Sequence, residues 1–468
     1  MLDSNAMVLF FPGPRSATGE DILEFHVHGG PAIVKSVLSA IPRCVSKSGT
    51  IRYAEAGEFT RRAFFNDRLD LTQVEALGDS LTAMTEQQRR LSVRGTVNKL
   101  TQRYNVWREL LLSARGELEA LIDFSEDQHF DESSTELISN VAQQVTKLQQ
   151  PLLAHTQNAV RGELLRNGIS ISLLGAPNAG KSSLLNRIVG REAAIVSHEA
   201  GTTRDVVEVS VDIGGYLCRF GDTAGLRRAL KLPTATSNED IGSVEQEGIR
   251  RAKARATESD LVIVVLSFES GHLKLDSEVI DTAQALLKEH GNILVVVNKI
   301  DQKPVNLSAG NVVQQIQASV PGIPDSAIHL LSCNPAPEHA TPIDPQLDGI
   351  GPFLSGLVIK FQTMTSAVAG PAPDGAEADA SIWQESLGAT ERQRLLLEEC
   401  SNHLDSFLQV GRHGGQDGLD DGQDVDFVLA AEHLRAAAGC LARITGKGEA
   451  GDVEEVLGVV FERFCVGK

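Results

Sequence analysis

The stretch GAPNAGKSSLLN, Gly175 to Asn186, limits the fold of this chain more than any other feature. Its spacing G-x-x-x-x-G-K-S follows the apolar run ISISLLG and precedes the helical pattern SSLLNRIVG. The glycines let backbone N–H groups curl around a phosphate, and the helix N-terminus adds its positive dipole end. The stretch therefore predicts a P-loop, which sits between a strand and a helix of a βα domain.

The residue types within this loop predict separate roles in nucleotide binding. Lys181 is expected to neutralise the β- and γ-phosphates, and the Ser182 hydroxyl to bind Mg²⁺. The predicted nucleotide-binding residues of the loop are Asn178, Ala179, Gly180, Lys181, Ser182 and Ser183.

Two motifs downstream predict the rest of the Mg²⁺ and γ-phosphate site. In DTAG, which follows a strand-like run, Asp222 is expected to reach Mg²⁺ through water and the Gly225 N–H to meet the γ-phosphate. In GTTRD, Thr203 is expected to be the second protein ligand of the ion. The predicted Mg²⁺ ligands are thus Ser182, Thr203 and Asp222.

A third motif, NKID, predicts which base is bound. It ends the apolar run NILVVV, and its last residue, Asp301, can accept hydrogen bonds from both N1–H and N2–H₂ of guanine, which adenine does not offer. The weaker motif LSC is placed for backbone contact to guanine O6. The predicted base-site residues are Asn298, Lys299, Asp301, Ser332 and Cys333, and the ordered set of motifs predicts a GTPase.

Composition and patterning predict several domains. A length of 468 residues suggests about three domains at roughly 150 residues each. The net charge of −19 creates no global positive field to attract nucleic acid, although a local basic patch would suffice for RNA. No apolar run approaches the roughly 20 residues of a membrane-spanning helix. The six cysteines form no C-x-x-C pair, which favours free thiols in a reducing compartment.

The pattern changes along the chain at three places. Residues 1–71 read as strand, turn, strand and helix, residues 72–167 as long helices, 168–363 as alternating strands and helices, and 364–468 again as helices. The simplest arrangement packs the two helical stretches together as one discontinuous domain, with the βα domain inserted into it.

Several motifs together resemble the MnmE/TrmE family of tRNA-modifying GTPases, which includes mitochondrial members. They are FPGPRSATGEDILEFHVHGGP, EAGEFTRRAFFNDRLDLTQVEAL, GAPNAGKSSLLN, REAAIVSHEAGTTRD, DTAGLR and the closing ITGKGEAGDVEEVLGVVFERFCVGK. The resemblance implies an α/β P-loop GTPase domain inserted in a discontinuous α-helical domain, behind a partial α+β folate-binding N-terminal domain.

The resemblance also implies a K⁺-stimulated hydrolysis mechanism. Asn178, Gly201 and Thr202 would bind K⁺ when two G domains meet, in place of an arginine finger. Glu245 would orient the attacking water through a second water; its position alone favours a solvated acid at a helix N-terminus, and the resemblance reverses that preference. The segment RRALKLPTATSNED before it is longer than the family pattern leads us to expect.

For the outer domains, the resemblance implies a homodimer that binds 5,10-methylene- or 5-formyl-tetrahydrofolate. Glu58, Arg61 and Asn66 are the candidates for the folate pocket. Cys465, in the family's C-terminal Cys-x-Gly-Lys, would face the modification site; by position it could instead be a tail thiol. Family members carry a further segment before FPGP, so we expect a fragment, a mispredicted start, or impaired folate binding and dimerisation.

The implied function is modification of tRNA at C5 of the wobble uridine, of the 5-carboxymethylaminomethyl type, with a separate FAD-dependent partner of the MnmG/GidA type. The expected location is the mitochondrion. This expectation comes from the family resemblance and is not read from a transit peptide in the sequence. The alternatives are a ribosome-assembly GTPase switch that binds RNA without chemistry and a purely structural role. The motifs FCVGK and GEFTRRAF argue against the ribosome-assembly alternative, and folate binding would test for a structural role.

Overall fold

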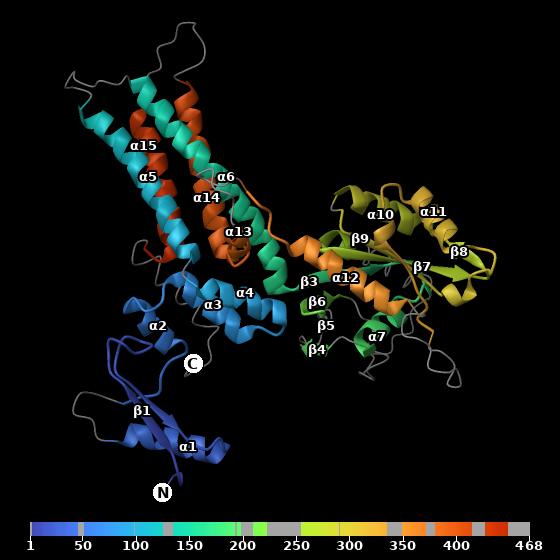
Figure 1. The fold of residues 1–468 in the computed structure, drawn as a ribbon, viewed down its shortest axis with the longest axis horizontal. Coiled ribbons are helices and arrows are strands. Elements are labelled where there is room, and N and C mark those ends of the chain that lie inside the picture. The colour runs from blue at the N-terminus through green and yellow to red at the C-terminus, as the bar shows by residue number, and fades with distance from the viewer. Residues whose placement is uncertain are drawn as a thin grey trace, which may run out of the picture. The chain divides into compact units, whose positions relative to one another are not determined.

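The fold is described from a computed structural model that forms two compact units (Figure 1). We call residues 1–83, 89–162 and 367–468 the helical unit, and residues 84–88 and 163–366 the sheet unit. Each is described by itself. The structure describes residues 2–44, 51–97, 99–124, 134–191, 194–197, 209–221, 254–289, 291–334, 349–370, 380–413 and 426–447.

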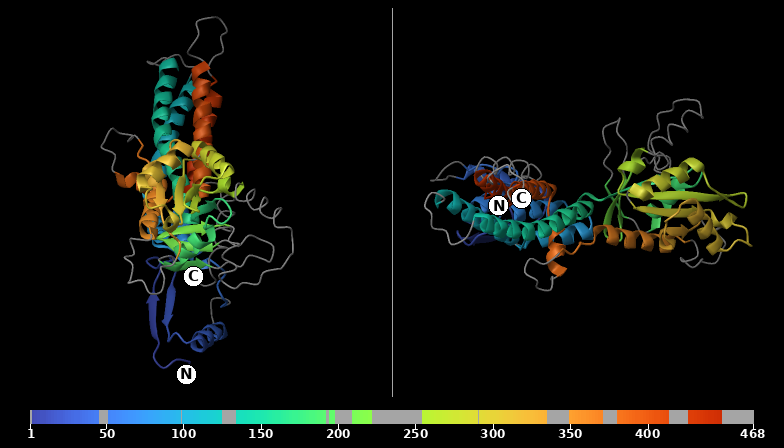
Figure 2. Two further views of the ribbon diagram at one scale, coloured as in Figure 1. Left: turned by 90° about the vertical axis from the view of Figure 1, so that its right-hand side faces the viewer. Right: turned by 90° about the horizontal axis from the view of Figure 1, so that it is seen from above.

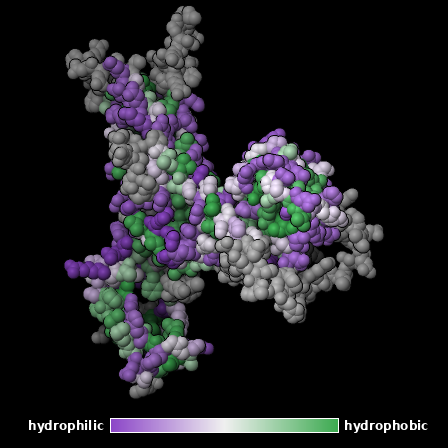
Figure 3. Space-filling view, turned by 45° about the vertical axis from the view of Figure 1, so that its right-hand side comes forward, coloured by the Kyte–Doolittle hydropathy of each residue, from purple (hydrophilic) through white to green (hydrophobic). Residues whose placement is uncertain are grey.

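The helical unit begins with a two-stranded antiparallel hairpin. Strand β1 (Met7–Phe11) pairs with β2 (Ile22–His26), and Met7 lies opposite His26. Helix α1 (Pro31–Ala40) follows, with Pro31 in its first turn, where a missing N–H costs nothing. The hairpin exposes large apolar side chains: Met7, Phe10 and Leu23 are 56%, 60% and 53% exposed. Apolar surface is visible on this N-terminal part in Figure 3.

Two short helices lead from the hairpin to the long ones. They are α2 (Glu58–Phe65) and α3 (Leu71–Thr82). Asp70 starts α3 with a reciprocal cap: its carboxylate accepts from the Gln73 N–H at 2.9 Å, and the Gln73 side-chain oxygen accepts from the Asp70 N–H at 3.0 Å. This capping box satisfies two backbone donors that a helix start otherwise leaves unpaired.

The long helices share one apolar core although they come from both sides of the sheet unit in sequence. They are α5 (Lys99–Phe124), α6 (Ser134–Asn167), α14 (Glu391–His413) and α15 (Phe427–Thr445); the shorter α4 (Glu86–Thr96) and α13 (Ala380–Ser386) contribute no residue to that core. Tyr104 and Trp107 of α5, Leu152 of α6, Phe407 of α14 and Leu434 of α15 belong to one buried cluster. Helix α15 runs along both α5 and α14 and packs on each of them (Figures 1 and 2).

The sheet unit is built on a mostly parallel sheet, as the P-loop pattern predicts. In the described residues its strand order is β10-β9-β7-β3-β6-β5-β4, with β8 added beside β7. Strands β3, β6, β7, β9 and β10 pair in parallel, whereas β5 pairs antiparallel with β4 and β6. The strands are β3 (Ile169–Leu174), β4 (Ala194–Ser197), β5 (Val209–Ile213), β6 (Tyr216–Phe220), β7 (Leu261–Glu269), β8 (His272–Lys274), β9 (Ile293–Asn298) and β10 (Ile328–Leu330).

The central strands are apolar along their whole length because parallel strands of such a sheet are covered on both faces. Every residue of β9 is buried, as are the first eight of β7. The helices of this unit are α7 (Lys181–Arg191), α10 (Ser277–Glu289), α11 (Ala309–Ser319) and α12 (Ile350–Thr365). Since β3 and β9 both pair with β7, their carboxyl ends meet at one edge of the sheet, where ligands bind in this class of fold.

Among the described helices, none is both long and apolar enough to cross a lipid bilayer.

Candidate nucleotide site and polar network

The loop between β3 and α7 has the backbone that a phosphate cradle requires. Gly175 lies so close to β7 that a Cβ there would be 2.4 Å from the Val265 carbonyl oxygen. Gly180 has a φ of +98°, and a Cβ there would be 2.0 Å from Nδ2 of Asn298. Asn178 also has a positive φ, 60°, which asparagine tolerates better than most residues. Glycine is therefore required at both ends of the loop.

Lys181 lies folded over this loop. Its Nζ donates hydrogen bonds to the carbonyl oxygens of Gly175, at 2.7 Å, and Ala176, at 2.9 Å. Burial lowers the pKa of Lys181, because the charged form loses hydration. The ammonium group thus lies at the junction of the loop and the first turn of α7, in position to contact a phosphate.

The loop forms one wall of a pocket of about 540 Å³. Nine of its lining residues are those that the sequence predicts for GTP: Asn178, Gly180, Lys181, Ser182, Ser183, Asn298, Lys299, Asp301 and Cys333. The pocket therefore joins the P-loop to the NKID and LSC segments. Gln302 and Asn334 also line it and were not predicted, although each directly follows a predicted residue.

Asn298 connects the two ends of the pocket. It is 2% exposed, and its Nδ2 donates to the Ala179 carbonyl at 3.0 Å. Its Oδ1 accepts from the backbone N–H of Lys299, at 2.8 Å, and of Cys333, at 3.1 Å. One buried amide thus ties together the P-loop, the NKID segment and the LSC segment. Ala179 does not line the pocket; its carbonyl serves as the anchor.

Asp301 is held by Ser332 at the base end. The Ser332 hydroxyl donates to Oδ1 of Asp301 at 2.6 Å and accepts from the Asn334 N–H at 3.3 Å. Ser332 itself is not a lining residue, so its contribution is to orient the carboxylate. A carboxylate fixed in this way can accept the paired N1–H and N2–H₂ donors of guanine.

The remaining predicted residues of the catalytic, metal and C-terminal sites lie outside the described residues. They are Gly201, Thr202, Thr203, Asp222, Gly225, Glu245 and Cys465.

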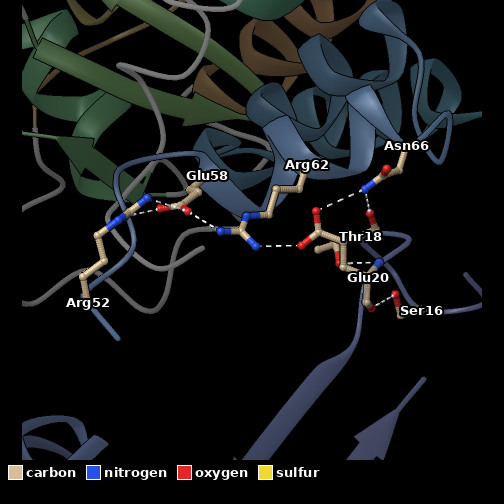
Figure 4. A network of polar contacts seen from close by, with 7 residues as sticks. All are labelled: Ser16, Thr18, Glu20, Arg52, Glu58, Arg62 and Asn66. Carbon is tan, nitrogen blue, oxygen red and sulfur yellow. Dashed lines mark hydrogen bonds and ion pairs between the residues drawn. The ribbon is translucent and has the colours of Figure 1, made fainter. Parts of the chain in front are cut away.

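A second polar group lies in the N-terminal part of the helical unit (Figure 4). Arg52 forms a forked ion pair with Glu58, at 2.8 and 3.0 Å, and Arg62 bridges Glu58, at 2.7 Å, to Glu20, at 2.6 Å. The hydrogen bonds from Arg52, the Glu55 N–H and Arg62 lower the pKa of Glu58 to about 2. We call Glu20, Arg52, Glu58, Arg62 and Asn66 the N-terminal polar network.

Two of the three predicted folate residues belong to this network. Glu58 is at its centre, and Asn66 Nδ2 donates to the Thr18 carbonyl at 2.9 Å. The third, Arg61, lies over the ring of Phe65 at 5.7 Å from its centroid, a cation–π contact outside the network. Arg62 was not predicted. The spacing of four residues between Glu58 and Arg62 on one helix is the signal that could have found it.

Comparisons with known proteins cover both units. A family model described as "MnmE helical domain" matches residues 71–465, and one described as "GTP-binding protein TrmE N-terminus" matches residues 1–68. The chain is 38% identical to the mitochondrial 5-taurinomethyluridine tRNA synthase subunit GTPB3 of Homo sapiens, over 99% of this chain and 81% of that protein.

Fungal and bacterial relatives match to a similar degree. The mitochondrial tRNA modification GTPase mss1 of Schizosaccharomyces pombe is 35% identical, over 99% of this chain and 84% of that protein. The tRNA modification GTPase MnmE of Parvibaculum lavamentivorans is 37% identical, over 99% and 86%. Among solved structures, the G domain of the T. maritima FeoB iron transporter covers 42% of this chain and 98% of its own at 21% identity, with a TM-score of 0.25. The predicted fold class is confirmed by the family models and by the helix-rich structure with its mostly parallel sheet.

Proposed function

Because this chain belongs to the MnmE/TrmE family of tRNA modification GTPases, we propose that it is a K⁺-stimulated GTP hydrolase that acts on C5 of the wobble uridine of tRNA. The proposed modification is of the 5-carboxymethylaminomethyl type and requires a separate FAD-dependent partner of the MnmG/GidA type. The relatives from mitochondria support, for this chain, a mitochondrial site of action.

One observation carries the nucleotide part of this proposal: the P-loop and the NKID segment line a single pocket, and Asn298 joins them. Phosphate recognition at Lys181 and base recognition at Asp301 thereby become two ends of one rigid site. Since an adenine offers no pair of donors to Asp301, the arrangement favours GTP over ATP.

For hydrolysis, the proposal assigns the following roles. Ser182 lines the pocket and offers the hydroxyl that Mg²⁺ needs, with Thr203 and Asp222 as its further protein partners. Asn178 lines the same pocket and would hold K⁺ with Gly201 and Thr202. A bound K⁺ supplies positive charge to the phosphate oxygens, an effect worth about 10³–10⁵ in rate where arginine fingers provide it. Glu245 orients the attacking water and the Gly225 N–H meets the γ-phosphate.

The N-terminal part is proposed to bind a tetrahydrofolate, either the 5,10-methylene or the 5-formyl form, and to form a homodimer. Two observations support this. The network around Glu58 and Arg62 offers fixed charges and Asn66 an amide, the donors and acceptors that a pterin ring and a glutamate tail can use. The exposed apolar side chains of β1 and β2 form a surface of the kind that protein interfaces bury. Cys465 is proposed to act at the modification site.

The test is GTP hydrolysis by the full chain in matched KCl and NaCl, over a range of protein concentrations. We expect a rate that is larger in KCl and that rises more steeply than the protein concentration, because K⁺ is held when two G domains meet. Lys181→Ala is the inactive control. Equal rates in KCl and NaCl would contradict the potassium mechanism. If the parent protein hydrolyses GTP in both salts and Lys181→Ala does not, the assignment as a GTPase still stands.

A further inference from the structure

Helices α14 and α15 carry a group of metal-binding side chains that neither the nucleotide pocket nor the N-terminal polar network uses. Glu399 and His403 come from α14, and Cys440 comes from α15. One ligand atom of each lies within 4.8 Å of the other two. Within the part of the chain that the structure describes, this is the one group of His, Cys, Asp and Glu residues with such close spacing.

The two ligands on α14 are placed together by the helix itself. Glu399 and His403 are four residues apart, so their side chains project from the same face. Pairs of ligands at this spacing on one helix can bind one ion. The packing of α15 on α14 brings Cys440 to the same face. The His433 ring of α15 packs 5.9 Å from the ring of His403 and so holds that imidazole against α15.

Burial changes gradually across the group. Cys440 is 3% exposed, His403 is half-buried, and the Glu399 side chain is 48% exposed. The thiol is therefore the floor of the site and the carboxylate its mouth. An ion has a path from solvent, and a water molecule can complete its coordination at the mouth.

The charges around the thiol change when a metal binds. The Cys440 thiol is buried and lies beside the Glu399 carboxylate, so a thiolate there would be both desolvated and repelled unless a cation joined it. Arg443 forms an ion pair with Glu399 at 3.5 Å, which is a long distance for such a pair. Both side chains reach solvent, where ion pairs contribute little to stability. A divalent ion would replace the thiol proton, forming a metal–sulfur bond and releasing one H⁺ to water.

We propose that Glu399, His403 and Cys440 form a zinc site that joins α14 to α15. A thiolate, an imidazole and a carboxylate are the donors that Zn²⁺ takes in proteins, whereas Mg²⁺ and Ca²⁺ prefer oxygen alone. Bound only by the folded helices, the ion stabilises the helical unit in proportion to its saturation. The site differs from the Mg²⁺ and K⁺ sites in its residues and in its donor chemistry.

The test uses the full chain, freed of metal with a chelator and kept free of nucleotide. Co²⁺ is the probe, because a cobalt–thiolate bond gives a charge-transfer absorption in the near ultraviolet that oxygen and nitrogen ligands do not. We expect one equivalent of Co²⁺ with this absorption, which added Zn²⁺ removes. Cys440→Ser should abolish the absorption, and Cys44→Ser, which removes an exposed thiol elsewhere in the helical unit, should leave it unchanged. An absorption that survives in Cys440→Ser, or that is absent from the parent protein, overturns the proposal.

A second variant guards against misfolding at the buried cysteine. His403→Gln keeps the size of a half-buried side chain and removes the imidazole. Loss of an outer-shell partner of a metal site lowers metal affinity about 10–100-fold. His403 is a direct ligand, so we expect Zn²⁺ affinity to fall at least as much in this variant. The rise in Tm on adding Zn²⁺ should disappear as well, while GTP hydrolysis stays at the parent rate. Unchanged affinity in His403→Gln contradicts the site.

Discussion

The side-chain amide of Asn298 donates a hydrogen bond of 3.0 Å to the carbonyl of Ala179, 119 positions away in the chain. This contact joins the segment that reads the base to the loop that holds the phosphates. Because the amide oxygen also accepts from Lys299 and Cys333, the three segments depend on one buried side chain.

Asn298→Ala should therefore weaken the whole pocket. It removes three hydrogen bonds, to the Ala179 carbonyl and from the backbone N–H groups of Lys299 and Cys333, and each contributes about 0.5–1.5 kcal/mol. We expect nucleotide affinity to fall about 100-fold or more, measured by titration with a fluorescent GTP analogue. Asn311→Ala, at an exposed position of α11, is the matched control and should bind as the parent does. Equal affinity in both variants would contradict the connecting role.

Gly180→Ala should abolish nucleotide binding although it adds one methyl group. The new Cβ would lie 2.0 Å from Nδ2 of Asn298, at a φ of +98° that side chains rarely adopt. Gly190→Ala, on α7 directly after the loop, is the control, since a Cβ at that position meets nothing within 4 Å. There we expect unchanged binding and a gain of about 1 kcal/mol in the free energy of unfolding. Isothermal titration with GDP separates the two outcomes.

His155 should make the helical unit sensitive to acid. It is fully buried against Trp107 and Trp383, neither ring nitrogen has a hydrogen-bond partner among the residues that the structure describes, and burial lowers its pKa to about 3. The unfolded chain takes up the proton near pH 6.5, so stability is complete above that pH and is lost as pH falls toward 3. At pH 5 the loss is about 2 kcal/mol.

His155→Phe should remove this acid-induced loss of stability. The free energy of unfolding should therefore rise more at pH 5 than at pH 7.5. Urea unfolding followed by tryptophan fluorescence is the measurement. The chain has two tryptophans, and both pack on His155, so the signal reports this core. His272→Ala, at an exposed position on β8, is the control and should not change the pH dependence. An identical pH profile in His155→Phe would show that another group causes the loss.

Glu75→Ala should destabilise the helical unit strongly. The Glu75 carboxylate is buried on α3 and accepts from Arg392 Nε at 2.7 Å and Nη2 at 3.2 Å, and from the Gln393 amide at 2.5 Å. Arg392 is partly buried, so removing its carboxylate partner leaves a poorly hydrated charge uncompensated, and the cost approaches the about 3–5 kcal/mol of a fully buried pair. Glu432→Ala, which breaks a solvent-exposed pair with Arg435, should change the stability much less, because solvent screens that pair. Chemical unfolding of both variants decides the point, and equal effects would contradict it.

The local pattern was enough to predict where the nucleotide site begins. The run ISISLLG forms β3, the helix starts at Lys181, and NKID begins at the last residue of β9, because each of these depends on residues within a few positions. The link between Asn298 and Ala179 could not be predicted, since it joins segments that meet only after the sheet forms.

The directions of neighbouring side chains on a helix were a second feature that the sequence-based prediction missed. The sequence shows two consecutive arginines, Arg61 and Arg62, and the prediction named the first. One step along a helix turns a side chain by about 100°, so only Arg62 meets Glu58, and Arg61 covers Phe65. The group of Glu399, His403 and Cys440 escaped notice for the same reason as Asn298: its third member comes from another helix.

The shared core of α5, α6, α14 and α15 also has a consequence for synthesis on the ribosome. Its first two helices leave the tunnel before the sheet unit is made, and its last two leave after it. Glu75 precedes its partner Gln393 by 318 positions, which takes about 16–60 s at about 5–20 residues per second. During that interval α5 and α6 lack the two helices that complete their apolar core, so nascent chains of this protein are expected to need chaperone protection until α15 emerges.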